Sequence, residues 1–268
     1  MEQPPEKLLF ATAWINTWTA GSKICRANEP LDYCDKVANG FGIVMKAAGH
    51  IWAIERKEDK ADPADWVAKN VRSAESICTV RGNDTAPGRG INTVDFAIVV
   101  SHGGIPDPRN KIVSVGFSKK PCRLNKDPCR FCSDQTRFGN GKLKWVILDC
   151  CYSLEIDEAN GFTPWAIWRQ SFHGLHTIFG FTGQTTDSLW TSHRGQNFAF
   201  MIVQLDLELA EAWIDSAYSL WCNDRPVAAA AGRDREDANK RIETESLSRS
   251  FDSIPNKEVK TMMWVWRS

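Results

Sequence analysis

The sequence predicts an α/β protein, a three-layer α/β/α sandwich built around a mostly parallel sheet. Two stretches, 94–100 and 144–148, are nearly continuous apolar runs, which is typical of parallel strands that are buried on both faces. Other apolar runs of strand length alternate with segments of helical periodicity through most of the chain, as a parallel sheet with helical crossovers requires. No internal repeat or linker divides the 268 residues, so we expect a single domain over 1–268.

The first part of the chain supplies three of the predicted strands. Residues 8–15 form an apolar run typical of a buried strand, and 35–48 carry apolar residues at helical spacing before Gly49, a stop signal. Asp62 followed by Pro63 is typical of a helix start. The expected order is strand 8–15, helix 35–48, strand 50–54, helix start 62–66, loop 81–90 and strand 94–100.

The second part of the chain continues the alternation. Residues 112–117 are expected to form one arm of a β-hairpin, and 118–141 a basic, cysteine-containing loop. The highly charged segment 233–249 is expected to be a solvated helix or a mobile loop. The remaining elements are strand 144–148, helix 162–172, strand 176–181, a long amphipathic helix 195–221, strand 227–231 and a closing strand 262–266.

The composition argues against several classes of function. Lys plus Arg and Asp plus Glu both number 33, so the formal net charge is zero and no long-range field attracts nucleic acid or an anionic membrane. No apolar run reaches the ~18 residues of a membrane span, and residues 1–7 lack the features of a secretory signal. We therefore expect a cytoplasmic protein that binds neither nucleic acid nor a membrane.

Two predicted strands end in reactive residues. The strand at 94–100 is followed by His102 and Gly103, and the next strand by Cys151. Because active sites form where the carboxyl ends of parallel strands meet, we expect His102 and Cys151 to share one crevice. A thiolate is a strong nucleophile, and a neighbouring His can take the thiol proton. The N–H groups of Gly103 and Cys151 are then candidates to hold the developing oxyanion.

These residues resemble the motifs of caspase-like (clan CD) cysteine peptidases, a group that includes caspases, metacaspases, legumains and gingipains. In that family one apolar strand ends in His-Gly, and another ends in an acidic or amide residue, a small residue and the catalytic Cys. His102-Gly103 and Asp149-Cys150-Cys151 match this pattern, and the 49 residues between His102 and Cys151 are a similar separation. The resemblance implies a caspase-like sandwich and a cysteine endopeptidase without an organic cofactor.

Metacaspases show the closest motif, with two departures. Tyr152 and Leu154 stand where metacaspases have His and Gly, so the chain resembles a divergent, bacterial-type member of the wider group. The register of the motif makes Cys151 the nucleophile, with His102 as its acid/base partner, and puts Cys150 in the small-residue slot.

The same resemblance implies a preference for a basic residue at P1, the substrate position before the cleaved bond. In metacaspases the Asp two residues before the nucleophile lies at the base of the S1 pocket and pairs with Arg or Lys. Asp149 holds that position, and Asp187 ends a stretch, 183–187, that is similar to the cleft-shaping Gln-Thr-Ser-Ala-Asp loop of metacaspases. Cleavage after Arg or Lys is therefore expected. The alternative that Asp149 caps a backbone N–H and never meets substrate stays open.

The other cysteines raise the question of a metal. Cys122, Cys129 and Cys132 have spacing that suits zinc in part, but no fourth ligand is adjacent, so we expect no bound metal. Activation by calcium, self-cleavage within 118–141, and an inactivating disulfide between Cys150 and Cys151 stay open.

A rival hypothesis is a catalytically silent caspase-like module that binds a protein partner or structural zinc. The enzyme hypothesis instead implies a protein or peptide substrate and leaves room for a regulatory protein partner. The remaining histidines are expected to be structural or on the surface: His50, His173, His176 and His193.

Overall fold

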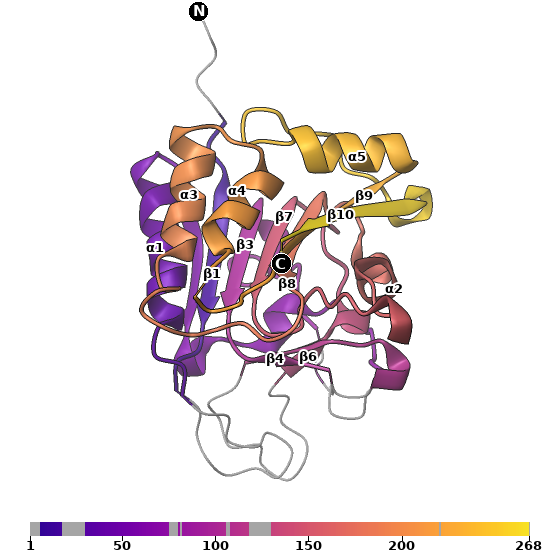
Figure 1. The fold of residues 1–268 in the computed structure, drawn as a ribbon, viewed down its shortest axis with the longest axis horizontal. Coiled ribbons are helices and arrows are strands. Elements are labelled where there is room, and N and C mark those ends of the chain that lie inside the picture. The colour runs from indigo at the N-terminus through magenta and orange to yellow at the C-terminus, as the bar shows by residue number, and fades with distance from the viewer. Residues whose placement is uncertain are drawn as a thin grey trace, which may run out of the picture.

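The computed structural model describes residues 6–17, 30–74, 80, 82–105, 108–117, 130–219 and 221–267. Its centre is a seven-stranded sheet in the order β10-β9-β8-β7-β3-β1-β2 (Figure 1). Neighbouring strands from β2 to β8 pair in parallel, and β9 pairs antiparallel with both β8 and β10. The mostly parallel α/β prediction is therefore confirmed. The strands are β1 (Leu9–Trp14), β2 (Ile51–Lys57), β3 (Phe96–Val100), β7 (Trp145–Asp149), β8 (Thr177–Phe181), β9 (Pro226–Gly232) and β10 (Thr261–Trp266).

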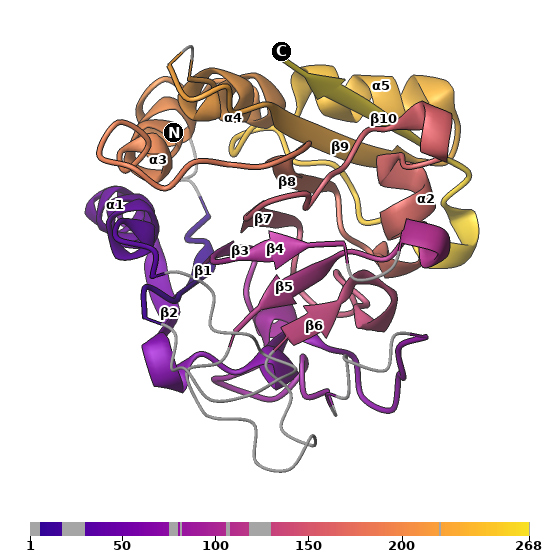
Figure 2. The same cartoon turned by 60° about the horizontal axis from the view of Figure 1, so that its bottom comes forward.

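Helices cover one face of this sheet. They are α1 (Cys34–Ala47), α3 (Arg194–Gln204), α4 (Leu209–Ala217) and α5 (Arg235–Thr244), and they form one layer in Figure 2. Phe41 of α1 and Phe198 of α3 stack with ring centroids 6.2 Å apart, and both rings also contact Phe96 of the sheet. Burying these large rings between two layers supplies much of the hydrophobic driving force on this side.

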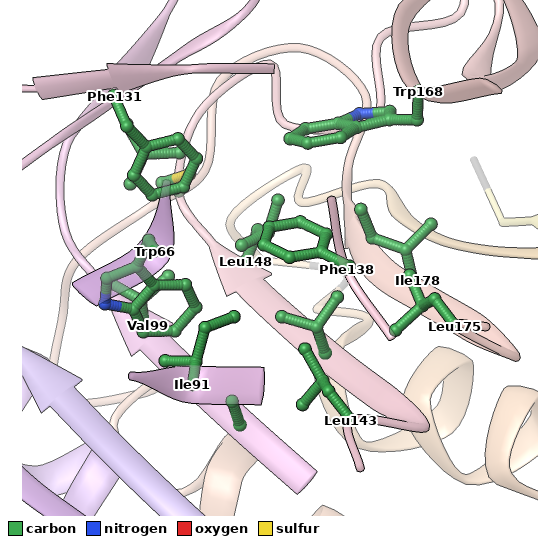
Figure 3. Packing of buried hydrophobic residues seen from close by; sticks show 14 of the residues in the cluster. Trp66, Ile91, Val99, Phe131, Phe138, Leu143, Leu148, Trp168, Leu175 and Ile178 are labelled. Atoms are coloured by element: carbon green, nitrogen blue, oxygen red, sulfur yellow. The ribbon is translucent and has the colours of Figure 1, made fainter. Parts of the chain in front are cut away.

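The opposite face of the central sheet is covered by short elements instead of long helices. It carries the five-residue helix α2 (Pro164–Trp168), several 3-10 turns, and a small antiparallel sheet of β4 (Gly103–Gly104), β5 (Ser114–Gly116) and β6 (Arg130–Cys132). Figure 3 shows Trp66, Phe131, Phe138 and Trp168 packed over sheet residues such as Leu148. Aromatic side chains from short elements thus replace the long helices expected on this face.

Several predicted helices are shorter than expected. The helix predicted over 195–221 is two helices, α3 and α4, and Asp206 between them has φ 48°, a left-handed conformation that does not continue a right-handed helix. The helix start at 62–66 is a 3-10 turn, Pro63–Trp66, with Asp62 as its N-cap. The helix predicted over 162–172 contains α2 followed by a second 3-10 turn.

The charged segment 233–249 contains α5, which begins after Asp234; the Asp234 side chain accepts a hydrogen bond from Asp237 N. This confirms a helix there. No helix in the described part of the chain is long and apolar enough to cross a membrane.

Candidate active site

The parallel register of β3 and β7 brings the predicted catalytic residues to one edge of the sheet. Val100, the last residue of β3, lies opposite Asp149, the last residue of β7. Ser101 N extends the ladder by donating to Asp149 O at 3.1 Å. His102 and Cys151 each follow two residues after this pair. They therefore leave adjacent strands at the same carboxyl edge, and both are partly buried.

Gly103 lies directly against the turn that carries the nucleophile. A Cβ atom on Gly103 would lie 2.2 Å from the carbonyl oxygen of Cys151 and 3.0 Å from the thiol sulfur of Cys150. The neighbouring residue, His102, accepts a hydrogen bond from Gly116 N through its carbonyl at 2.8 Å. Only a residue without a Cβ allows this approach, and β5 holds the His-Gly segment over the turn.

The vicinal cysteines have different environments. Cys150 is fully buried in the apolar core, whereas Cys151 is partly exposed. Burial raises the pKa of the Cys150 thiol well above its usual range. Both cysteines are free thiols, so the disulfide alternative for this pair is absent from the structure. Cys151 is the thiol that a substrate can reach.

The backbone just after Cys151 is strained. Tyr152 has φ 59°, a left-handed conformation that a residue with a Cβ seldom adopts. It is held there because Tyr152 N donates to Gly183 O at 2.6 Å. The Ser153 hydroxyl also holds this turn in place. It lies 2.9 Å from both Leu148 O and Cys150 O, and it accepts a hydrogen bond from Phe181 N at 3.0 Å. Strain of this kind is concentrated at functional sites.

The loop after β8 closes over the Cys151 sulfur. Thr185 N donates to Cys151 Sγ at 3.4 Å, and the thiol lies 3.7 Å from Thr185 O. Burial raises the pKa of the Cys151 thiol, the Thr185 N–H lowers it in part, and the charge of Asp149 raises it further. The resting sulfur is therefore a thiol, and it needs a base to become a nucleophile.

Asp149 belongs to a buried charge cluster beneath this loop. Its Oδ2 lies 3.0 Å from Arg194 Nε, and Arg194 Nη1 lies 3.3 Å from Asp224 Oδ2. Neither Arg194 Nε nor Asp149 Oδ2 has a well-aligned hydrogen-bond partner, so their attraction is chiefly electrostatic. Burial raises the pKa of Asp149 to about 6, although Arg194 lowers it.

Arg194 also holds the loop itself. Its Nη1 donates to Thr185 Oγ1 at 2.9 Å and its Nη2 donates to Thr186 O at 2.7 Å. Asp224 accepts from Thr186 N at 2.8 Å. Because Thr185 touches the thiol, Arg194 is a positioning residue for Cys151.

The predicted S1 carboxylates do not have the expected environment. Asp149 is 2% exposed and is neutralised by Arg194, so it presents no free carboxylate to a cationic substrate side chain. Asp187 accepts hydrogen bonds from Asp32 N and Tyr33 N at the start of α1. This geometry counts against a direct S1 role for Asp149. It is closer to the alternative, in which Asp149 is structural, although its partner is a guanidinium rather than a backbone N–H.

A pocket adjoins the site on the side of the strained turn. It has a volume of about 530 Å³. Ile105, three residues after His102, and Tyr152, next to Cys151, both line it. The side chains that line the pocket include both acidic and basic residues. Among them, the Lys111 ammonium lies 4.5 Å from the centre of the Phe162 ring. The other lining residues are Pro108, Arg109, Glu155, Asp157 and Asn160.

Three residues of the site were missed by sequence reasoning. Arg194 and Asp224 have no local signal, because their partners are distant in sequence. Thr185 lies in the predicted cleft loop, but its backbone contact with the thiol needs the tertiary structure.

Two of the three cysteines whose spacing suits zinc in part lie outside the described residues. Cys122 and Cys129 are among the residues not described. Cys132 is buried and disulfide-bonded, so its sulfur is not the thiolate that zinc requires. Within the described ranges, no group of three or more His, Cys, Asp or Glu could hold a metal ion.

The fold and the carboxyl edge of β3 and β7 define the class of protein. It is an α/β sandwich with a cysteine and a histidine at the carboxyl ends of adjacent parallel strands. Within that class, the chain belongs to the family described as Domain of unknown function (DUF6345), whose family model matches residues 12–268. No curated protein and no solved structure matched the chain.

Proposed function

We propose that this protein is a cysteine endopeptidase in which Cys151 is the nucleophile and His102 the general acid and base. The observation that carries the proposal is the register of β3 and β7, which brings His102 and Cys151 out of neighbouring strands at equal distance from the Val100–Asp149 pair. The strained residue after Cys151 and the close approach of Gly103 support it.

The proposed reaction begins with proton transfer. The raised pKa of the thiol keeps Cys151 protonated at neutral pH, so His102 takes the proton as the sulfur attacks the scissile carbonyl. A C–S bond forms, and His102 returns the proton to the amine as the C–N bond breaks. Water, deprotonated by His102, then attacks the thioester; the C–S bond breaks, His102 returns the proton to the Cys151 sulfur, and the acid is released.

Two backbone N–H groups are suited to hold the oxyanion. Hydrogen-bonded and non-hydrogen-bonded pairs alternate in an antiparallel ladder. Because His102 O accepts from Gly116 N, the next pair, Gly103 and Val115, is of the non-hydrogen-bonded kind. Gly103 N–H is therefore left for another acceptor. In the described part of the chain, Cys151 N donates to no backbone carbonyl. Each such donor is typically worth ~3 kcal/mol in kcat.

The surroundings of Asp149 and the adjoining pocket bear on the choice of the P1 residue. A basic P1 residue was expected from Asp149, yet its pairing with Arg194 removes the free charge. The pocket beside Tyr152 carries both basic and acidic side chains, which gives no strong selection for one sign of charge. The substrate class that we propose is therefore a peptide, with the P1 residue to be read from a panel.

The test is hydrolysis of fluorogenic peptides with Arg, Lys, Asp, Asn, Leu or Phe at P1, with and without calcium. Cys151→Ala and His102→Ala should each abolish turnover. Cys222→Ala is the matched control, since Cys222 is another partly exposed free thiol and its loss should leave turnover unchanged.

Turnover that survives Cys151→Ala would contradict the proposal. Absence of turnover, together with no reaction of Cys151 with peptidyl chloromethyl ketones, would favour the silent module that binds a protein partner. A cytoplasmic location and a regulatory partner stay predictions.

A further inference from the structure

A second group of reactive side chains lies at the opposite edge of the sheet. His176 directly precedes β8, at its amino end, whereas Cys151 follows the carboxyl end of β7. The His176 ring is fully buried, and its Nδ1 lies 2.6 Å from Glu245 Oε1. Its Nε2 lies 3.1 Å from Ser253 Oγ. Ser253 is exposed, so the chain of contacts runs from a buried carboxylate to a surface hydroxyl.

The order of these contacts favours one tautomer of the ring. A carboxylate accepts hydrogen bonds and cannot donate them, so Glu245 requires the proton on Nδ1. In the tautomer with its proton on Nδ1, the ring has a free electron pair on Nε2, where it can accept a hydrogen bond from the Ser253 hydroxyl. A hydroxyl, an imidazole and a carboxylate in this sequence are the arrangement that activates a serine for nucleophilic attack.

The carboxylate and the serine are both held in place. Glu245 also accepts from Thr177 Oγ1 and from Phe251 N, each at 3.3 Å. The residue before the serine, Asp252, accepts from Arg241 Nη2 through its carbonyl at 2.8 Å. Such contacts fix the direction of the imidazole and the position of the nucleophile.

The exposed position of Ser253 lets an acyl substrate reach its hydroxyl. In the ranges that the structure describes, Ser253 N–H donates to no backbone carbonyl, so it can receive a developing oxyanion. The ring centroid of Trp145 lies 5.9 Å from that of His176 in an edge-on contact, which helps to fix the orientation of the imidazole.

We propose that Ser253, His176 and Glu245 form a second acyl-transfer site, of the serine-hydrolase type, for small carboxylic esters. Ser253 Oγ attacks the ester carbonyl while His176 Nε2 takes the hydroxyl proton. The proton passes to the leaving alcohol as its C–O bond breaks. Water then cleaves the acyl-serine, so one ester and one water give one acid and one alcohol. The site is independent of Cys151.

The test uses the full chain carrying Cys151→Ala, so that the thiol cannot contribute. A fluorophosphonate probe should form one adduct, on Ser253, and p-nitrophenyl acetate should be hydrolysed with a burst. Ser253→Ala should abolish both signals, whereas Ser250→Ala, which removes another exposed serine of the same segment, should leave them unchanged. His176→Gln should slow labelling by about 100-fold or more.

Both serines are exposed, so neither substitution disturbs the core, and folding of each variant is checked by circular dichroism. The proposal is overturned if Ser253 is labelled no faster than Ser250 in the folded chain. It is also overturned if urea-unfolded protein is labelled at the native rate.

Discussion

Arg194 Nε lies 3.0 Å from Asp149 Oδ2, and the two side chains are 5% and 1% exposed. The same guanidinium holds Thr185, whose backbone touches the Cys151 sulfur. A single buried cation therefore controls both the charge near the nucleophile and the position of the loop above it.

Asp149→Asn should make the Cys151 thiol more acidic. Burial is the main cause of the raised pKa of Cys151, and the charge of Asp149 adds to it. Removing that charge while Arg194 stays lowers the pKa. Alkylation of Cys151 by iodoacetamide, followed by mass spectrometry, should therefore reach half its maximal rate at a lower pH than in wild type. Asp215→Asn, at a carboxylate that is about half exposed, is the control. If the pH of half-maximal alkylation is unchanged or higher in Asp149→Asn, the charge of Asp149 does not raise the pKa of Cys151.

Arg194→Ala should strongly destabilise the fold. It leaves Asp149 and Asp224 buried without their cation, a change that typically costs about 3–5 kcal/mol. Urea unfolding measures this loss. Arg267→Ala removes a largely exposed partner of Asp215 and should change the free energy of unfolding by less than about 1 kcal/mol. A loss for Arg194→Ala as small as that of the control would mean that the cluster contributes little.

Gly103→Ala and Gly104→Ala should differ although the residues are neighbours. A Cβ at Gly103 meets the Cys151 carbonyl oxygen at 2.2 Å, whereas a Cβ at Gly104 meets nothing within 4 Å. Because backbone atoms cannot rotate away, Gly103→Ala should cost about 1–3 kcal/mol and displace the turn of the nucleophile. Thermal unfolding and the alkylation rate of Cys151 report the two effects. Equal behaviour of the two variants would argue against the close approach.

The stability of the protein should respond to pH through Asp84. Burial raises the pKa of this carboxyl to about 6 from 3.8, and the hydrogen bond from Asn92 lowers it only in part. Since the folded pKa is above the unfolded one, the stability contributed by the neutral acid is fully present below pH 3.8 and is lost as pH rises through about 6.

Asp84→Asn removes this dependence. Relative to wild type, its free energy of unfolding should rise by up to about 3 kcal/mol between low pH and neutral pH, the equivalent of about two pKa units. Urea unfolding of both proteins at several pH values measures the difference. A difference that does not change with pH would show that Asp84 is ionised normally.

Local patterns predicted the strands well because a buried parallel strand is a continuous apolar run. The runs at 94–100 and 144–148 contain β3 and β7, and the residues after them meet at one edge. Helix lengths were predicted less well, since the break at Asp206 depends on how α3 and α4 pack rather than on a Gly or Pro.

The sequence by itself determined the α/β class, the parallel strand pair and the two residues, His102 and Cys151, that follow it. These features depend on hydrophobic periodicity and on residue type, which are local. Tertiary structure alone decided that Asp149 faces Arg194 instead of an open pocket, and that His176 links Glu245 to Ser253. Both arrangements join residues far apart in the chain, and the partner of a buried charge is chosen by three-dimensional packing, not by its sequence neighbours.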